Sequence, residues 1–246
     1  LYWALDQTKG SKSHSCGITA YCGEQAHAAD VIIEGLEILQ NRGYDSAGVC
    51  TLDGEGELEI TKYASLVNTD DSIARLKKEA LEKHANRTIG IGHTRWATHG
   101  GKTDENAHPH ADWKNRIALI HNGTVSNDKY LRGKMSENNI PLKSETDTEL
   151  IANYIGLMMD QGEKIEGAIK KALAEVEGTW GLVVLEKGGD QLYCARNGSP
   201  LLIGIGQKAM YIASEAMAFQ RYTSNFIQLN DGEIAVVNHH NHNLDM

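Results

Sequence analysis

The sequence predicts a layered α+β domain. Many short apolar segments with the character of strands surround a group of helical segments in the middle of the chain, which is the element order of α+β proteins. The chain has 246 residues, 41% of them apolar and 23% charged. These values are ordinary for a globular protein, and the length suffices for one large domain or at most two small ones.

Hydrophobic spacing predicts the elements of the first half of the chain. In the segment 27–40 apolar residues recur at the spacing of a helix face, whereas residues 58–63 alternate as in a strand. By the same criteria we expect strands at 16–22, 49–52, 58–63, 88–94 and 117–122, and helices at 27–40, 70–83 and 127–137. The glycine-bracketed segment 42–48 is expected to be a turn. The polar segment 95–110 is expected to be a long loop, and loops of about that length are uncommon and often functional.

The second half begins with helix-start signals and continues mainly with strands. In the run Ser144-Glu-Thr-Asp-Thr-Glu149, hydroxyl and acidic residues are placed as at a helix N-terminus. Apolar residues then follow on one helix face, namely Leu150, Ile151, Tyr154, Ile155 and Met158. A further helix is expected at 165–176, and strands at 179–186, 191–195, 200–205, 209–213, 225–229 and 233–237.

Composition excludes several classes of function. The formal net charge is −9 and no Lys/Arg cluster carries interleaved aromatic residues, so we expect no nucleic-acid partner. No apolar run approaches the ~20 residues of a membrane span, so no membrane is expected either. The four cysteines are too scattered for a disulfide framework, which favours a reducing, cytoplasmic setting. The spacing of His93, His99, His108 and His110 matches no zinc motif, so we expect no metal and no cofactor.

Cys16 is the candidate nucleophile. Cysteines inside apolar strands, such as Cys50 and Cys194, are usually buried as small hydrophobic residues, but Cys16 starts the first strand after the polar segment 1–15. We expect that segment to be a leader or propeptide. A nucleophile at a chain N-terminus can use its own α-amino group as the base, because that amine has an ordinary pKa of ~7.7–8.0. Here a peptide bond joins Ser15 to Cys16, so the amine is masked in the sequence as printed.

Three further groups could complete a site for acyl transfer. Asn122 and Gly123 follow an apolar strand and could donate N–H groups to an oxyanion, although Asn-Gly pairs also form simple turns. Arg95 could bind a carboxylate through two parallel N–H bonds, the alternative being an ordinary surface arginine. Asp147 could accept hydrogen bonds from an ammonium group, although acidic residues also favour the first turn of a helix without further function.

Seven short motifs, taken together and in order, resemble one protein family. They are Cys16-Gly-Ile, Arg42-Gly-Tyr-Asp-Ser-Ala-Gly48, His93-Thr-Arg-Trp-Ala-Thr-His-Gly100, Asn106-Ala-His-Pro-His110, His121-Asn-Gly123, Ser144-Glu-Thr-Asp-Thr-Glu149 and Gly198-Ser-Pro-Leu201. They are similar to the glutaminase domain of the glutamine–fructose-6-phosphate aminotransferases (isomerizing), which are class II glutamine amidotransferases. The resemblance extends from Cys16 to about Val237.

The resemblance implies a fold and a role for each candidate residue. The fold would be the four-layer αββα sandwich of the N-terminal-nucleophile hydrolases. Cys16 would attack the side-chain amide of L-glutamine to form a thioester, with Asn122 and Gly123 as the oxyanion hole. The remaining implied roles are substrate carboxylate binding by Arg95, amino-group binding by Asp147, pocket lining by Thr98 and His99, gating of ammonia by Trp96, and support of the nucleophile by Arg42.

The resemblance also implies a domain organisation and partners. The glutaminase domain would cover 16–240, and 241–246 would begin a linker to a sugar isomerase domain that binds fructose 6-phosphate and is missing from this chain. In the full enzyme, expected to be a homo-oligomer, the ammonia would convert fructose 6-phosphate to glucosamine 6-phosphate. Two alternatives are a class II amidotransferase domain with another acceptor, which the string around Trp96 argues against, and a glutamine-binding module without catalysis if Cys16 is never unmasked.

Overall fold

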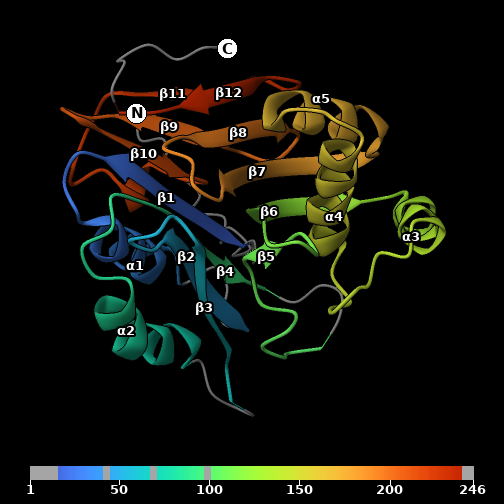
Figure 1. Cartoon of the computed structure of the whole chain (residues 1–246). Coiled ribbons are helices and arrows are strands. Elements are labelled where there is room, and N and C mark those ends of the chain that lie inside the picture. The colour runs from blue at the N-terminus through green and yellow to red at the C-terminus, as the bar shows by residue number, and fades with distance from the viewer. Residues whose placement is uncertain (1–15, 41–44, 67–70, 97–100, 240–246) are drawn as a thin grey trace, which may run out of the picture.

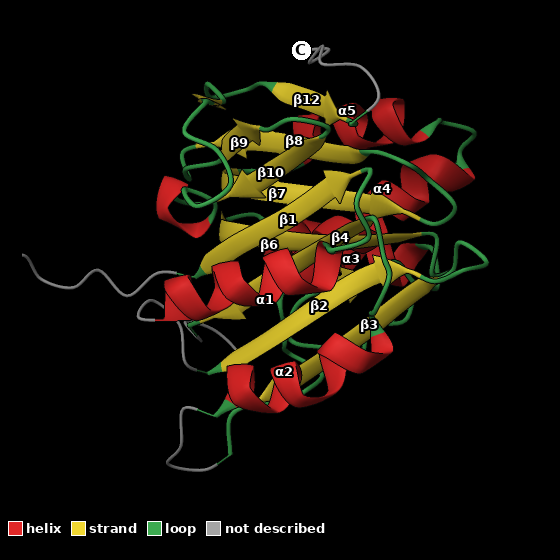
Figure 2. Cartoon of the chain, turned by 90° about the vertical axis from the view of Figure 1, so that its left-hand side faces the viewer, coloured by secondary structure: helices red, strands yellow, loops and turns green. Residues whose placement is uncertain are grey.

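The chain folds into four layers, with two antiparallel β-sheets between two layers of helices. The computed structural model describes residues 16–40, 45–66, 71–96 and 101–239. In Figure 1 helices α1 and α2 lie on one side of the sheets and α3, α4 and α5 on the other, and in Figure 2 α1 and α2 lie in front of the first sheet. The predicted α+β sandwich is therefore confirmed.

The first sheet has seven strands in the order β11-β9-β10-β1-β4-β2-β3, each antiparallel to its neighbours. Their bounds are Gly17–Gly23 (β1), Ser46–Leu52 (β2), Leu58–Ala64 (β3), Ile89–Arg95 (β4), Leu202–Ile205 (β9), Ala209–Ala213 (β10) and Phe226–Gln228 (β11). Because side chains alternate along a strand, Ile18, Ala20 and Cys22 of the central β1 all face the second sheet.

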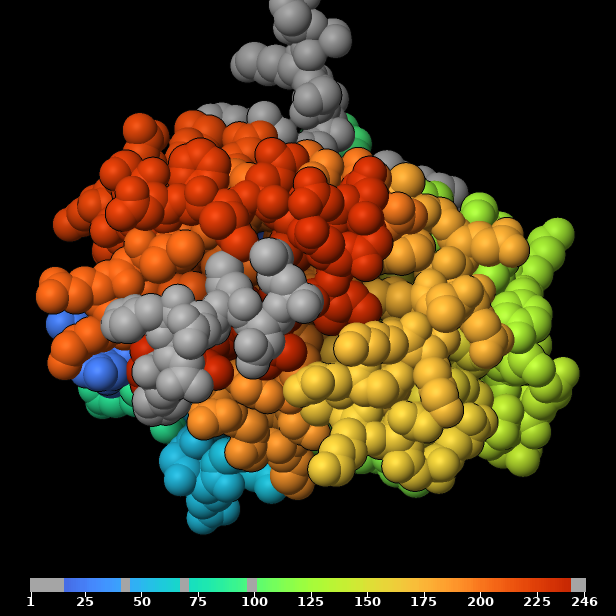
Figure 3. Space-filling model, turned by 90° about the horizontal axis from the view of Figure 1, so that it is seen from above, coloured from blue at the N-terminus to red at the C-terminus, as the bar shows by residue number. Residues whose placement is uncertain are grey.

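The second sheet has five strands in the order β12-β8-β7-β6-β5. Their bounds are His110–Ala111 (β5), Ile117–Val125 (β6), Gly178–Glu186 (β7), Leu192–Asn197 (β8) and Ile234–Val237 (β12). Seen from above in Figure 3, the orange and red C-terminal strands cover one end of the sandwich beside the yellow helices α4 and α5. The core between the sheets takes fully buried residues from both, such as Ile91 from the first and Ile120 from the second.

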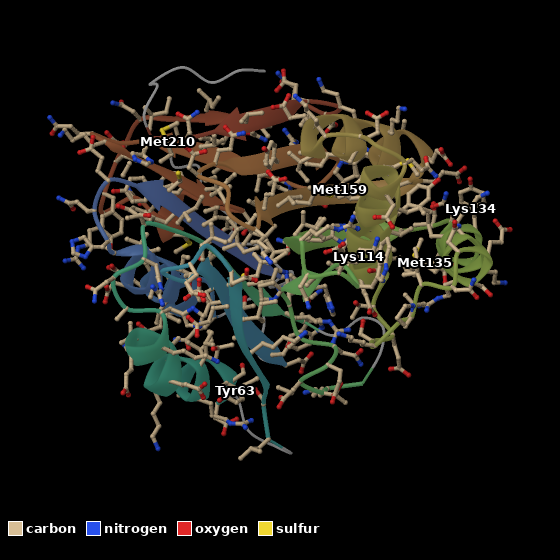
Figure 4. The ribbon with its side chains drawn as sticks, in the orientation of Figure 1. Tyr63, Lys114, Lys134, Met135, Met159 and Met210 are labelled. Carbon is tan, nitrogen blue, oxygen red and sulfur yellow. The ribbon has the colours of Figure 1, made fainter. Side chains whose placement is uncertain are left out.

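In the described part of the chain, five α-helices cover the outer faces of the sheets. Their bounds are Ala28–Leu39 (α1), Ser72–Lys83 (α2), Asp128–Glu137 (α3), Asp147–Asp160 (α4) and Ile165–Glu175 (α5), and a 3-10 turn spans Ala216–Ala218. Helix α1 packs on β1 and β4, α2 on β2 and β3, and α4 on β6, while α3 and α5 flank α4. Met135, labelled in Figure 4, lies in the core that α3 forms with α4. Among the described residues, no helix has the length and apolar character needed to cross a membrane.

The structure differs from the sequence-based expectation at three places. Strand β2 begins at Ser46, inside the expected turn, because it already pairs with β4 there. Strand β6 continues past Asn122 and Gly123 to Val125, because β7 pairs with its whole length. The short strand β5, which pairs with β6, occupies the end of the expected loop 95–110. The pair Asn122-Gly123 therefore belongs to a strand and does not form a simple turn.

Candidate active site

One end of the sandwich brings together the ends of four elements. Cys16 directly precedes β1 there, β4 ends there at Arg95, β6 ends there at Val125, and α4 begins there at Asp147. These strands converge, together with β5, near the centre of the view in Figure 1. Because β1 and β4 run antiparallel, the start of one lies beside the end of the other. Cys16 and Arg95 are thus neighbours although they are far apart in the sequence.

The thiol of Cys16 is partly buried and contacts the backbone of Trp96. The Trp96 N–H donates to Sγ over 3.3 Å, and Sγ lies 3.6 Å from the Trp96 carbonyl oxygen, which can accept the thiol hydrogen. Burial raises the pKa of the Cys16 thiol, although the Trp96 N–H and the charge of Arg95 act in the opposite direction. The thiol is therefore protonated at neutral pH, and it needs a base before it can act as a nucleophile.

The side chain of Asn122 connects the two sheets at this end. Its Oδ1 accepts a hydrogen bond from Nε2 of His93 on β4 over 2.9 Å, and its Nδ2 donates to the Cys16 carbonyl oxygen over 2.8 Å. Burial lowers the pKa of His93 to about 3, so the ring is neutral at pH 7 and the bond to Asn122 requires the Nε2–H tautomer. An amide NH2 group has two N–H bonds, so Asn122 can donate to Cys16 and to a substrate oxygen at the same time.

Gly123 follows Asn122 at the exposed end of β6. Its φ of +145° lies in a region that side chains rarely adopt, and a Cβ built there would lie 2.0 Å from the Thr179 carbonyl oxygen of β7. Any other residue would therefore force β6 and β7 apart next to Asn122. The bare backbone also allows a ligand to approach the Gly123 N–H closely.

Arg95 supplies a buried positive charge beside Cys16. The residue is 6% exposed, and its Nη1 lies 3.5 Å from the Gly101 carbonyl oxygen, to which it donates. Burial lowers the pKa of the Arg95 guanidinium, while the Cys16 thiol and the carboxylates of Asp45 and Asp147 oppose that shift. A guanidinium does not lose its proton in proteins, so Arg95 is a cation held among acidic groups.

Asp147 supplies a negative charge within electrostatic range of the same thiol. It is the first residue of α4, where the helix dipole favours a carboxylate, and its Oδ2 accepts a hydrogen bond from the Val125 N–H over 2.9 Å. The helix start is fixed by Thr146, whose side chain accepts a bond from the Glu149 N–H. A cation and an anion near one nucleophile could bind the two charged ends of an amino acid.

Four buried histidines lie behind these groups. The rings of His93 and His108 are stacked with centroids 4.0 Å apart, and His108 meets His110 edge-on at 5.0 Å. Burial is the main cause that lowers the pKa of these three rings and of His121, so all four are neutral at pH 7. Within the described ranges, no group of three or more His, Cys, Asp or Glu side chains could hold a metal ion.

The structure brings together every predicted site residue that it describes. These residues are Cys16, Arg95, Trp96, Asn122, Gly123 and Asp147. The predicted residues Arg42, Thr98 and His99 lie outside the described residues.

Sequence reasoning missed two residues that shape the site. His93 is not among the predicted site residues, yet its position two residues after Ile91 places it on the face of β4 towards the second sheet, where it meets Asn122. Asn106 joins two segments, since its Nδ2 donates to the Gly101 carbonyl oxygen over 3.0 Å and its Oδ1 accepts from the Glu145 N–H over 2.9 Å. No local pattern signals this second role, because the Glu145 partner lies 39 residues away in the sequence.

Comparison with known sequences gives one consistent family. The glutamine amidotransferase domain family matches residues 93–221, which is just over half of the chain. The chain is 43% identical to the glutamine–fructose-6-phosphate aminotransferase [isomerizing] of Thermococcus kodakarensis over 223 residues, covering 90% of this chain and 36% of that protein. It is 41% identical to the protein of the same name from Synechocystis sp. over 229 residues, covering 89% of this chain and 35% of that protein. The chain thus spans about a third of the length of the curated relatives it matches.

Comparison with solved structures gives the same fold. Glutamine phosphoribosylpyrophosphate amidotransferase from B. subtilis, complexed with ADP and GMP, superposes with a TM-score of 0.75 and 26% identity, covering 91% of this chain and 47% of that one. A structure described as the allosteric regulatory enzyme of purine biosynthesis superposes with a TM-score of 0.77 and 27% identity, and it also covers 91% of this chain and 47% of that one. The predicted fold of the N-terminal-nucleophile hydrolases is therefore confirmed.

The buried histidines predict a steep loss of stability in acid. Their pKa values are lowered on folding, so below about pH 6.5 the unfolded chain binds protons that the folded chain does not. The free energy of unfolding should therefore fall as the pH falls, by up to ~1.4 kcal/mol per pH unit for each ring. Urea unfolding between pH 7 and pH 5 measures this slope.

A pair of histidine variants tests the assignment of that slope. His108→Leu should reduce the slope by up to ~1.4 kcal/mol per pH unit, the contribution of one proton. The matched control is His27→Leu, which removes an exposed ring and none of the four buried ones. An unchanged slope in His108→Leu would show that the proton is taken up elsewhere.

Proposed function

The chain belongs to the glutamine amidotransferase domain family, and from this premise we propose that it hydrolyses the side-chain amide of L-glutamine through a Cys16 thioester. One observation carries the proposal: the Asn122 side-chain amide donates to the carbonyl oxygen of Cys16 over 2.8 Å, so the oxyanion donor lies next to the residue that bears the nucleophile. Arg95 and Asp147 act electrostatically on the same thiol. Nucleophile, oxyanion donors and substrate charges are the components that acyl transfer from an amino acid amide requires.

In the proposed reaction the base is the α-amino group that Cys16 gains when the Ser15–Cys16 peptide bond is cleaved. The amine takes the thiol proton, Sγ attacks the amide carbon, and Asn122 Nδ2–H and the Gly123 N–H stabilise the negative charge on the substrate oxygen. The protonated amine then gives its proton to the leaving nitrogen, and ammonia departs. Water hydrolyses the thioester with the amine again as base, which releases glutamate and restores the thiol.

Substrate selection in this proposal depends on the two ends of glutamine. The planar guanidinium of Arg95 binds the α-carboxylate through two parallel N–H bonds, and the carboxylate of Asp147 accepts from the α-ammonium group. Asp147 can do this while it accepts from the Val125 N–H, since a carboxylate has about four acceptor positions. The pocket roles of Thr98 and His99 are part of the same proposal, as are the gating role of Trp96 and the supporting role of Arg42.

We further propose fructose 6-phosphate as the acceptor of the ammonia, bound by a sugar isomerase domain and converted to glucosamine 6-phosphate. Support comes from relatives at 43% and 41% identity that are named glutamine–fructose-6-phosphate aminotransferase. A phosphoribosyl acceptor has weaker support, because the amidotransferase structure so named is only 26% identical.

All four cysteines are free thiols, which favours a cytoplasmic setting. The homo-oligomeric state of the full enzyme stays a prediction.

Unmasking of Cys16 is the first test of the mechanism. Protein that begins at Cys16 should hydrolyse glutamine and should be labelled at Cys16 by an electrophilic glutamine analogue, as seen by intact mass. Protein that begins at Ser15 is the matched control, and it should show no turnover because its Cys16 nitrogen is an amide. Full activity of the control would refute the amine as base. Glutamine binding without turnover or labelling in the Cys16 form would support a binding module instead.

Loss of the Asn122 donor tests the oxyanion hole. Removing one such donor typically lowers kcat by ~10²–10³-fold, so Asn122→Ala should lower glutaminase kcat to that degree in protein that is still folded at the assay temperature. Asn127→Ala in the α3 N-cap is the control and should leave kcat unaltered. A loss smaller than about tenfold in Asn122→Ala would contradict the assignment.

Replacement of Arg95 by lysine tests the carboxylate clamp. The variant keeps the charge but loses the planar pair of N–H bonds, so the KM for glutamine should rise about tenfold or more while kcat changes less. The exposed Arg221, changed to lysine, serves as the control. An unaltered KM in Arg95→Lys would count against the clamp.

A further inference from the structure

A row of paired residues crosses the first sheet at the level of His93. Ile18 of β1 pairs with His93 of β4. His93 pairs in turn with Gly48 of β2, which pairs with Lys62 of β3. Paired residues point to the same face of an antiparallel sheet, so Lys62 faces the second sheet as His93 does. The next residue, Tyr63, faces the opposite way and is labelled beside α2 in Figure 4.

The segment 105–109 crosses this row at Gly48. A Cβ built on Gly48 would lie 2.0 Å from the His108 carbonyl oxygen, which is far closer than any side chain tolerates. The absence of a side chain on β2 therefore creates the space through which the 105–109 segment passes. This places His108 directly over β2, which pairs with β4.

The side-chain ammonium group of Lys62 donates hydrogen bonds to three backbone carbonyl oxygens of the 105–109 segment. Its Nζ lies 2.7 Å from the oxygen of Ala107, 3.2 Å from that of Pro109 and 3.3 Å from that of Glu105. An ammonium group has three N–H donors, so each carbonyl can receive one. Burial lowers the pKa of Lys62 to about 8, against the pull of nearby carboxylates, so the group remains charged at neutral pH.

The 105–109 segment in turn fixes the ring of His93. The ring of His108 is stacked on it with an interplanar angle of 29°. Neither Nδ1 atom of these two rings has a hydrogen-bond partner among the described residues. The stack on His108 and the Nε2 bond to Asn122, with a backbone contact from His121, therefore orient His93. The position of this ring determines where the Asn122 amide points.

We propose that Lys62 is a positioning residue for the oxyanion hole, acting through the 105–109 segment, His108 and His93 on Asn122. The proposal rests on the proposed glutaminase function. Among the described residues, the hydrogen bonds of Lys62 go to the carbonyl oxygens of Glu105, Ala107 and Pro109, and none goes to Cys16, Arg95 or Asp147. Its loss should therefore weaken stabilisation of the transition state more than it weakens substrate binding.

The test is steady-state kinetics on protein that begins at Cys16. Lys62→Met removes the donors but keeps the length of the side chain, and a small displacement of a catalytic group is enough to lower kcat by about tenfold or more. The KM for glutamine should change by a clearly smaller factor than kcat. Lys78→Met on the neighbouring helix α2 is the matched control, because Lys78 is an exposed lysine remote from the site. A rise in KM at constant kcat, or no change at all, would overturn the proposal.

A double-mutant cycle separates positioning from a general structural role. If Lys62 acts through Asn122, then Lys62→Met should cause little further loss of kcat in an Asn122→Ala background, whereas independent effects would multiply. Multiplied losses would refute the proposal. Should Lys62→Met fail to fold, Lys62→Gln keeps N–H donors on a shorter side chain and the same cycle applies. If Asn122→Ala alone has no effect on kcat, the oxyanion hole of the proposed function is refuted. That outcome differs from one in which Asn122→Ala lowers kcat and Lys62→Met does not, which refutes only the role of Lys62.

Discussion

Two hydrogen bonds of Asn122 connect the sheets where the apolar packing between them ends. The residue belongs to β6 in the second sheet, and its partners His93 and Cys16 belong to β4 and to the start of β1 in the first. Everything assigned to the chemistry depends on this connection. If the two sheets moved apart at this end, the nucleophile and the oxyanion donor would separate, while the rest of the core could persist.

Burial gives this end of the sandwich its electrostatic character. The same removal of water that raises the pKa of the Cys16 thiol keeps the histidines behind it neutral. Among the described residues, the charges that act on the thiol are those of Arg95 and Asp147. A neutral His93 can donate to Asn122 without competing for a substrate carboxylate. The arrangement also explains why a separate base is needed, since the described hydrogen-bond partners of Sγ are the N–H and the carbonyl oxygen of Trp96, and a backbone amide is not a base at neutral pH.

Much of the fold could be predicted because most elements carry their own periodicity. The alternation in β3 and the helical spacing in α1 needed no tertiary partner to be recognised. The exceptions are segments whose local sequence predicts one structure but whose pairing with a neighbouring strand imposes another. Asn122-Gly123 has the composition of a turn but is held in β6 by β7, and the two-residue β5 exists only because β6 pairs with it. Pairing of this kind depends on residues distant in the sequence.

The sequence by itself determined the residue types of the site and their order, because each motif is short and local: Cys16, Arg95, Asn122 and Asp147 were all identified before their positions were known. Only the tertiary structure decided which of them touch and what holds them. The link from Lys62 through His108 and His93 to Asn122 follows from the register of four strands and from the missing side chain of Gly48. Strand register is a property of the packed sheet, so no local pattern could have predicted that link.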